Sequence, residues 1–385
     1  MIEKHLANHL RDRPPSLKEA KEKGVKIIGY LPGNYVPEEI IYASGAIPIG
    51  LTDGGSPHPA DTALSVVPQI ICPFARAQVG ERLLKTNPYY SMLDMVVAPI
   101  TCQHLKKAAE IWEYDGDIKV FKLGIPHQYD GDFELEYYTD RLRVLKERLE
   151  AFTGNAITNV KISEAIELYN KMRELLKNIS LMRRNLSPPL TALEFVKLNH
   201  ASFYADPVFM VNELESFYKG LEKSQPNHKP NRPRLLLAGP NLARGDYKIL
   251  ELIEAAGGEV VIEELCEGMR YYWHHIENNE DPFQSLAKGY LKDRIPCAFM
   301  RSSTKKRFDF ALGLIIDFNV SGVIWYELQC CETYDQESYY FNKKLREQNI
   351  PMLIVESNYD ISDAGPLRTR IDAFIELMKG GSDFA

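Results

Sequence analysis

The sequence alternates short apolar runs with amphipathic segments, and this alternation occurs once in each half of the chain. The runs that we interpret as strands are 25–31, 46–51, 94–100 and 118–124, and then 234–239, 258–264, 322–327 and 351–357. The helices predicted among them are 36–45, 73–85 and 103–114, and then 247–257, 334–349 and 367–380. Strands that alternate with helices predict parallel sheets joined by right-handed crossovers.

The alternation predicts an α/β fold with two parallel-sheet domains of the Rossmann or flavodoxin-like type, and 385 residues are enough for two or three domains. Between the two halves, apolar side chains recur at helical intervals over 133–225, and the polar, proline-rich stretch 223–234 reads as a linker. The divisions that we expect are an N-terminal helical segment 1–24, a first α/β domain 25–132, a helical region 133–230 and a second α/β domain 231–385.

The composition excludes several classes of protein. Hydrophobic residues make up 45% and charged residues 26% of the chain, which is typical of a soluble globular protein. No apolar run approaches the ~20 residues that span a bilayer, and the charged N-terminus lacks the apolar region of a signal peptide. The net charge of −7, without a basic stripe, argues against nucleic acid as a partner. We therefore expect a cytoplasmic protein that binds neither membranes nor nucleic acid.

Six cysteines are the most informative residues for function. In a long chain without an export signal, metal binding or redox chemistry is favoured over disulfides. At least four of the six follow a predicted strand or begin a predicted helix, where open α/β sheets place their ligands. Helix N-termini at such positions add N–H donors and a positive dipole end, which favour thiolates. The six are Cys72, Cys102, Cys266, Cys297, Cys330 and Cys331.

The intervals between the cysteines suggest two sets of three ligands. Cys72 and Cys102 lie 30 residues apart, Cys266 and Cys297 lie 31 apart, and the adjacent Cys330–Cys331 pair offers one member to each set. A cubane cluster has four irons, so three thiolates leave one iron that needs another ligand. Two such clusters facing each other would share a bridging sulfide.

Three other interpretations of the cysteines stay open. Each thiol could equally be a small buried hydrophobe. A disulfide between Cys330 and Cys331 would be strained and is disfavoured in the cytosol. Zinc would suit two sets of three thiolates if a histidine or water supplied the fourth ligand, although the chain has no closely spaced Cys-x-x-Cys pair.

Segments along nearly the whole chain resemble the 2-hydroxyacyl-CoA dehydratase and benzoyl-CoA reductase superfamily. In dehydratase-type members of that superfamily, each subunit holds one [4Fe–4S] cluster on three cysteines, which correspond here to Cys72, Cys102 and one of Cys330 and Cys331. The segments that carry the resemblance are ICPFARAQVGERL (71–83), VVAPITCQHLKKAAEIW (96–112), GIPHQYDGD (124–132), LEFVKLNHASFYADP (193–207), GVIWYELQCCETYDQE (322–337) and IPMLIVESNYDISDAGPLRTRIDAFIELM (350–378).

The additional Cys266 and Cys297, with the doubled cysteine, resemble the double-cubane cluster proteins of that superfamily. There, six cysteines of one chain hold an [8Fe–9S] cluster of two cubanes bridged by sulfide. The resemblance implies a homodimeric reductase of small unsaturated or N–N bonded molecules, such as acetylene, azide and hydrazine. Its electrons would come at low potential from an activator, an ATP-hydrolysing protein of the actin-like class with its own [4Fe–4S] cluster.

Two alternative functions remain beside this reductase. One is a CoA-ester dehydratase or aromatic-ring reductase subunit with a single [4Fe–4S] cluster, which would not need Cys266 or Cys297. The other is a non-enzymatic electron carrier. Two residues near the cysteines are candidate proton donors, namely His104, two residues after Cys102, and Glu327, three residues before Cys330.

Overall fold

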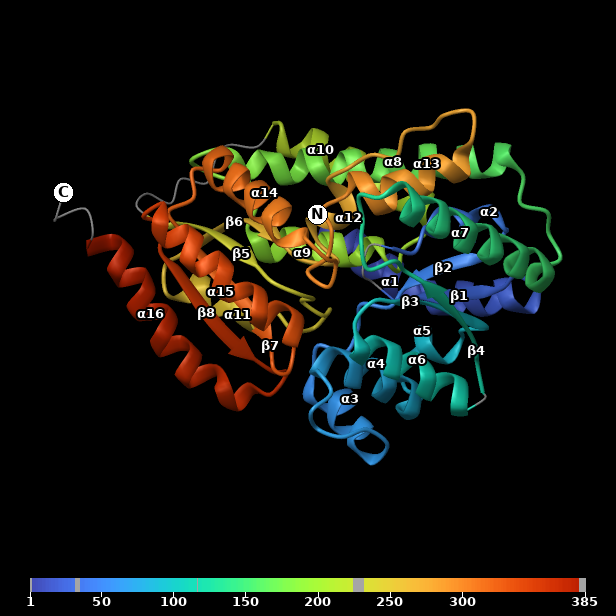
Figure 1. Ribbon diagram of the computed structural model, residues 1–385, viewed down its shortest axis with the longest axis horizontal. Coiled ribbons are helices and arrows are strands. Elements are labelled where there is room, and N and C mark those ends of the chain that lie inside the picture. Colours follow the sequence, from blue (N-terminus) through green and yellow to red (C-terminus); the bar gives the residue numbers. More distant parts are fainter. Residues whose placement is uncertain (1, 32–34, 116, 224–231, 381–385) are drawn as a thin grey trace.

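The computed structural model of the protein describes residues 2–31, 35–115, 117–223 and 232–380. It contains two lobes, each built around a four-stranded parallel sheet (Figure 1). The strands of the first sheet are β1 (Ile27–Tyr30), β2 (Ile47–Gly50), β3 (Met95–Ile100) and β4 (Lys119–Gly124). Those of the second are β5 (Arg234–Ala238), β6 (Glu259–Glu264), β7 (Gly322–Leu328) and β8 (Met352–Ser357).

Both sheets have the same strand order. The first runs β2-β1-β3-β4 and the second runs β6-β5-β7-β8, so each begins with its second strand at one edge. Every pairing is parallel. Both the α/β class and the two sheets predicted from the sequence are therefore confirmed, and the doubly-wound order places the carboxyl ends of each sheet's strands at one edge.

Helices follow or precede each strand and bury the sheets. These helices pack on the sheets because each has an apolar face. Among the helices of the two lobes, α11 and α6 have the most one-sided distributions of apolar residues. In the first lobe the helices are α1 (Ile2–Glu22), α2 (Glu38–Ala43), α3 (Pro57–Thr62), η1 (Ala63–Ser65), α4 (Pro73–Leu84), α5 (Pro88–Ser91) and α6 (Gln103–Asp115). In the second half of the chain they are α11 (Lys248–Ala255), α12 (Met269–Tyr272), α13 (Pro282–Lys288), η3 (Gly289–Asp293), α14 (Ser303–Asp317), α15 (Glu332–Glu347), η4 (Ile361–Asp363) and α16 (Ala364–Gly380), of which α13 and η3 pack against α7.

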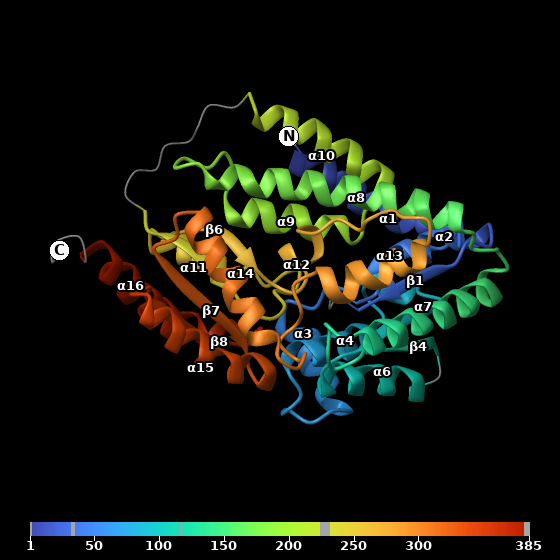
Figure 2. The same ribbon diagram turned by 45° about the horizontal axis from the view of Figure 1, so that its top comes forward.

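A helical layer connects the two lobes. Its central helix α8 packs against α2 of the first lobe and against α12 of the second, so it crosses the junction (Figure 2). Residues 224–231 of the predicted linker 223–234 lie outside the described residues, Arg234 at its end begins β5, and the domain boundaries stay a prediction. The elements of this layer are α7 (Asp132–Thr153), α8 (Asn159–Leu181), η2 (Met182–Arg184), α9 (Ala192–Ser202) and α10 (Pro207–Leu221).

The lobes also touch directly through their backbones. Asp53 and Arg244 form an isolated parallel β-bridge, and the Arg244 amide donates to the Thr52 carbonyl at 2.7 Å. The Arg244 guanidinium is also paired with the Asp53 carboxylate. Gly55 is needed at this contact because a Cβ there would stand 2.2 Å from the Asp246 nitrogen. None of the helices in the described ranges is long and apolar enough to cross a bilayer.

Candidate iron–sulfur site

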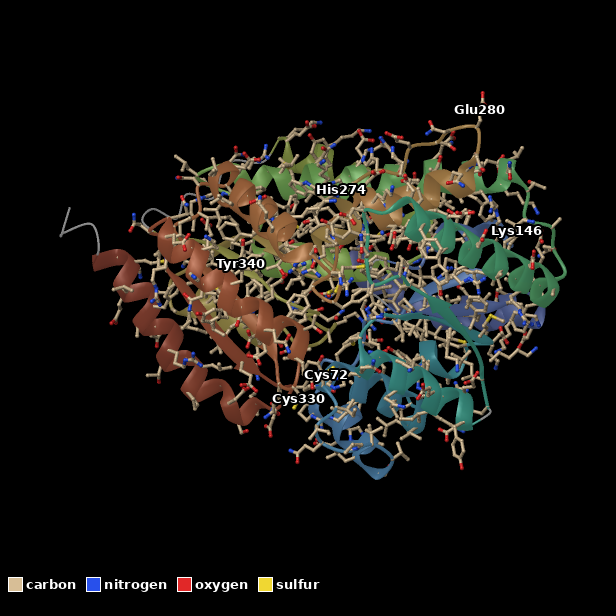
Figure 3. The ribbon with its side chains drawn as sticks, in the orientation of Figure 1. Cys72, Lys146, His274, Glu280, Cys330 and Tyr340 are labelled. Atoms are coloured by element: carbon tan, nitrogen blue, oxygen red, sulfur yellow. The ribbon has the colours of Figure 1, made fainter. Side chains whose placement is uncertain are left out.

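A cavity of about 640 Å³ lies where the carboxyl ends of the two sheets meet, and five of the six cysteines line it. Figure 3 labels Cys72 at this junction, with Cys330 nearby. Cys330 is the exposed member of the six and does not line the cavity. Its backbone is left-handed, with φ of 62°. The five lining cysteines are Cys72, Cys102, Cys266, Cys297 and Cys331.

Two of these cysteines come from the first lobe and begin helices. Cys72 is the N-cap of α4, with Pro73 in the first helical position, and its sulfur accepts a hydrogen bond from the Ala75 amide at 3.5 Å. Cys102 follows β3 and precedes α6, and its carbonyl accepts from the Lys106 amide. Both sulfurs therefore lie at helix N-termini, where amides and the helix dipole stabilise negative charge.

The second lobe supplies Cys331, which joins the two cysteines of the first lobe. Cys331 is the N-cap residue of α15, directly after the turn that follows β7. Burial raises the pKa of the Cys331 thiol, and negative charge on Cys72 and Cys102 raises it further. Burial and then the neighbouring Cys102 raise the pKa of Cys72, to about 12. These three thiols therefore lie within electrostatic range of one another and form one group.

Cys266 and Cys297 form a second group beside the first. The hydrogen bond that the Cys266 thiol shares with Cys297 lowers the pKa of Cys297 to about 5 and raises that of Cys266. Because a coupled pair titrates as a unit, the pair is best described as two sulfurs holding one proton. Burial raises the pKa of Cys102 and of Cys331, and Cys297 raises both further, so it faces the first group.

A buried arginine supports this second pair. The Arg270 guanidinium donates from Nη1 to the Cys266 sulfur at 2.9 Å and also to the Tyr334 hydroxyl. That hydroxyl lies 3.4 Å from the Cys266 sulfur and 3.9 Å from the Cys297 sulfur. A fixed positive charge and a phenol beside the two sulfurs favour the thiolate form that metal ligation requires.

Arg270 is itself held by a buried ionic network. It donates to both oxygens of Glu264, at 2.5 and 3.0 Å. Arg307 also donates to both Glu264 oxygens and, through Nε, to Glu337. Burial raises the pKa of Glu264, but the two arginines outweigh it and hold that pKa below its ordinary value. The network fixes the orientation of Arg270 toward the cysteines.

This network was not predicted from the sequence. The strongest sign of this network in the sequence is the spacing of its residues from the cysteines. Arg270 lies four residues after Cys266, and Tyr334 and Glu337 lie three and six residues after Cys331. The spacing from Cys331 places both residues near the start of α15, next to the thiol. Arg307 gave no comparable signal, because a separate helix, α14, brings it to the site.

The two predicted proton donors occupy different environments. His104 lines the cavity, and its Nδ1 accepts a hydrogen bond from the Cys72 amide at 3.2 Å, so its Nε2 carries the proton of the neutral ring. Glu327 lies in β7, is buried, and is not among the residues that line the cavity. Its Oε1 has no hydrogen-bond partner in the described part of the chain, and burial raises its pKa. Both roles stay predictions.

The arrangement suits a cluster better than a single ion. Within the described ranges, no three His, Cys, Asp or Glu side chains are close enough to hold one metal ion. The thiolates of an iron–sulfur cluster bind different irons, so they stand around a volume and do not converge on a point. Five sulfurs distributed around one cavity, with helix N-termini and Arg270 facing them, fit that requirement.

Comparison with known proteins agrees with the fold and with this site. Residues 34–378 match the family model described as 2-hydroxyglutaryl-CoA dehydratase, D-component. A match over most of the chain defines its class, and the protein belongs to this family. The six-cysteine set is thus found in a chain of the 2-hydroxyacyl-CoA dehydratase and benzoyl-CoA reductase superfamily.

Individual relatives cover nearly the full length of the chain. A protein of Escherichia coli (strain K12) with the provisional name dehydratase subunit YjiM is 28% identical over 94% of both chains. The (R)-phenyllactyl-CoA dehydratase beta subunit of Clostridium sporogenes is 21% identical over 94% of both. A benzoyl-CoA reductase subunit of Thauera aromatica is 22% identical over 92% of this chain and 91% of its own. The chain is therefore similar to subunits of dehydratases and reductases.

Proposed function

We propose that this chain is the iron–sulfur subunit of an enzyme that acts on CoA thioesters, as a dehydratase or a reductase. Three residues, Cys72, Cys102 and Cys331, would hold one [4Fe–4S] cluster. The observation that carries the proposal is the convergence of these three thiols, from both lobes, on one cavity. The names of the relatives support the substrate class, since they are subunits of CoA-ester dehydratases and of a benzoyl-CoA reductase.

The chain's own residues would prepare the cavity for such a cluster. When bound, the cluster supplies single electrons, and three protein thiolates leave one of its irons open. The N-termini of α4 and α15 would stabilise the negative charge at Cys72 and Cys331. His104, held by the Cys72 amide, would present Nε2–H as a hydrogen-bond donor to a substrate. The electrons would come from an ATP-dependent activator, as the resemblance implies.

A specific observation favours a second candidate function, the double-cubane reductase. Cys266 and Cys297 line the same cavity as the first group, and Cys297 faces Cys102 and Cys331. A single cluster would leave this pair and its buried Arg270 without a ligand to bind. In the second candidate an [8Fe–9S] cluster would use both groups, a homodimer would form, and acetylene, azide or hydrazine would be reduced. Cys330 would then have to turn inward to complete six ligands.

Iron and sulfide analysis of anaerobically purified full-length protein separates the two candidates. One cubane predicts about four irons per chain and two cubanes about eight. Cys331→Ala should reduce the iron content under both candidates, whereas Cys266→Ala should reduce it only under the second. Exposed Cys330→Ser is the matched control for Cys331→Ala under the first candidate, where it should retain the iron, whereas the second candidate needs Cys330 as a sixth ligand and predicts a loss of iron. Wild-type protein without iron, or Cys331→Ala with a full complement of iron, would contradict the proposal.

Turnover assays then test the substrate class. With an activator and ATP, a CoA thioester should be consumed under the first candidate and acetylene under the second. Neither reaction should proceed without ATP. A chain that binds iron yet turns over neither substrate would instead be the electron carrier considered above.

A further inference from the structure

A buried pair of acidic residues lies behind Cys266, outside the site described so far. Glu38 and Glu39 begin α2 and are 2% and 0% exposed. Both accept from Nη2 of Arg173 in α8, at 3.2 Å and 2.5 Å respectively. The Tyr290 hydroxyl donates to the second Glu39 oxygen at 2.8 Å. Burying two adjacent carboxylates costs stability even with Arg173 and Arg294 beside them, so such a pair points to a function.

A small internal cavity connects Glu38, one member of this pair, with Cys266. Its volume is about 20 Å³, which is enough for roughly one water molecule. All the residues that line it are buried. Of the described residues, Cys266 is the one that lines both this small cavity and the large cysteine cavity. The lining residues are Tyr30, Leu31, Val36, Glu38, Phe203, Cys266, Glu267, Tyr271, Tyr290 and Arg294.

The groups around Glu38 balance its charge closely. Burial and then the adjacent Glu39 raise the pKa of Glu38, Arg173 and Arg294 lower it, and the balance of these effects is a pKa of about 7. Its occupancy by a proton is therefore sensitive to any new charge nearby. The titratable and charged groups that face it are Glu39 on its own helix, Arg173 and Tyr169 on α8, Tyr30 on β1, Tyr271 on α12, Tyr290 on η3, Arg294 after η3, and Glu267 after Cys266.

We propose that Glu38 is a redox-linked protonation site for the centre in the cysteine cavity. When that centre gains one electron from a low-potential reductant, the Glu38 carboxylate takes up one proton from solvent and becomes a carboxylic acid. The inference rests on the proposed iron–sulfur centre. An added electron places negative charge in the cysteine cavity, on the other side of Cys266 from Glu38, and a medium of low dielectric constant transmits its repulsion to the carboxylate.

The linkage is reciprocal, so protonation also makes reduction easier. The reduced centre raises the pKa of Glu38 above its value in the oxidised protein. Between these two pKa values, reduction takes up a proton, and the midpoint potential falls as the pH rises. Below and above this window the potential is independent of pH. Glu38 is thus a positioning residue for charge, and it does not touch the substrate.

Anaerobic optical redox titration of the loaded full-length protein, with titanium(III) citrate as the reductant, tests this inference between about pH 6 and pH 9. The wild-type potential should depend on pH, and that dependence should disappear in Glu38→Gln and persist in Glu38→Asp. Glu39→Gln is the matched control, because it should retain the dependence but move it to lower pH. A folded, iron-replete Glu38→Gln variant with the wild-type dependence would overturn the inference.

A second measurement covers the case in which Glu38→Gln does not fold. The infrared difference spectrum between reduced and oxidised wild-type protein should contain the carbonyl band of a newly protonated carboxylic acid. This band should move in the Glu38→Asp variant and remain in place in Glu39→Gln. If the reduced protein shows no such band, the inference is wrong. Iron content measured on the same samples separates this failure from a failure of the proposed function, which would appear as protein without iron.

Discussion

Replacing Arg270 by glutamine should make the Cys266–Cys297 pair much harder to ionise. The guanidinium donates to the Cys266 sulfur at 2.9 Å, and its charge lowers the pKa of both thiols. A hydrogen bond to a charged group contributes about 1.5–3 kcal/mol. At about 1.4 kcal/mol per factor of ten, its loss predicts roughly 10- to 150-fold less thiolate at a given pH.

The same substitution also has a structural cost, which must be separated from the effect on the thiols. Arg270→Gln leaves the buried Glu264 with Arg307 as its remaining cation, and removing one partner of a buried ion pair costs about 3–5 kcal/mol. Arg183→Gln is a matched control. Arg183 is equally buried, and its side-chain hydrogen bonds go to Glu263 and Ser180. Both variants should lose similar stability in urea, and only Arg270→Gln should change the thiols.

The assay is alkylation of the metal-free protein by iodoacetamide across a range of pH, with each cysteine quantified by peptide mass spectrometry. In Arg270→Gln, the alkylation of Cys297 should shift to higher pH. Exposed Cys330 serves as the internal reference for reagent reactivity. If Arg270→Gln and Arg183→Gln give the same profile for Cys297, then Arg270 does not set the ionisation of the pair, and our account of the second thiol group is wrong.

Three further predictions concern stability. Gly80→Ala should lower the free energy of unfolding in urea by about 1–3 kcal/mol, because its new methyl group would stand 1.7 Å from the Pro59 carbonyl oxygen. Gly313→Ala has open space around it and should raise the free energy of unfolding by up to about 1 kcal/mol. Equal effects of the two substitutions would contradict this packing. Burial lowers the pKa of His274 to about 4, so the unfolded chain takes up a proton first and stability should fall by about 2–3 kcal/mol between about pH 6.5 and pH 4. His274→Gln should flatten that part of the urea-midpoint profile, and an unchanged slope would refute the assignment. Arg244→Ala removes the cation that pairs with Asp53 between the lobes and should lower the free energy of unfolding by about 1–3 kcal/mol in the same assay. A variant as stable as wild type would show that the backbone bridge alone is sufficient to hold the lobes together.

The strands could be predicted from the sequence because their local pattern and their environment agree. A run such as MVVAPI is continuously apolar, and in the structure Met95–Ile100 is a central strand with Met95–Pro99 buried. The short helix α12 (Met269–Tyr272) was not among the predicted helices, because a single turn is too short to show an apolar period.

The convergence of the cysteines on one site could be predicted from the topology. The orientation of each individual cysteine could not. Cys102 and Cys331 follow the carboxyl ends of β3 and β7, Cys72 begins α4, and the fold brings all three to one cavity. Spacing alone did not show which member of the adjacent pair faces inward. That choice depends on one left-handed residue, Cys330, which turns its own side chain out and leaves Cys331 inside. Cys297 lies in an irregular segment between η3 and α14, so no periodic pattern could place it.

Cys331 belongs to the second lobe, whereas its two neighbours Cys72 and Cys102 belong to the first. Any inorganic group held by these three sulfurs therefore crosslinks the lobes. Its binding free energy is also free energy of docking one half of the molecule onto the other, and it is fully available only when both halves are in place. Loading the centre and closing the protein thus become one thermodynamic event, in which a weakened lobe contact lowers metal affinity and a lost metal loosens the lobes.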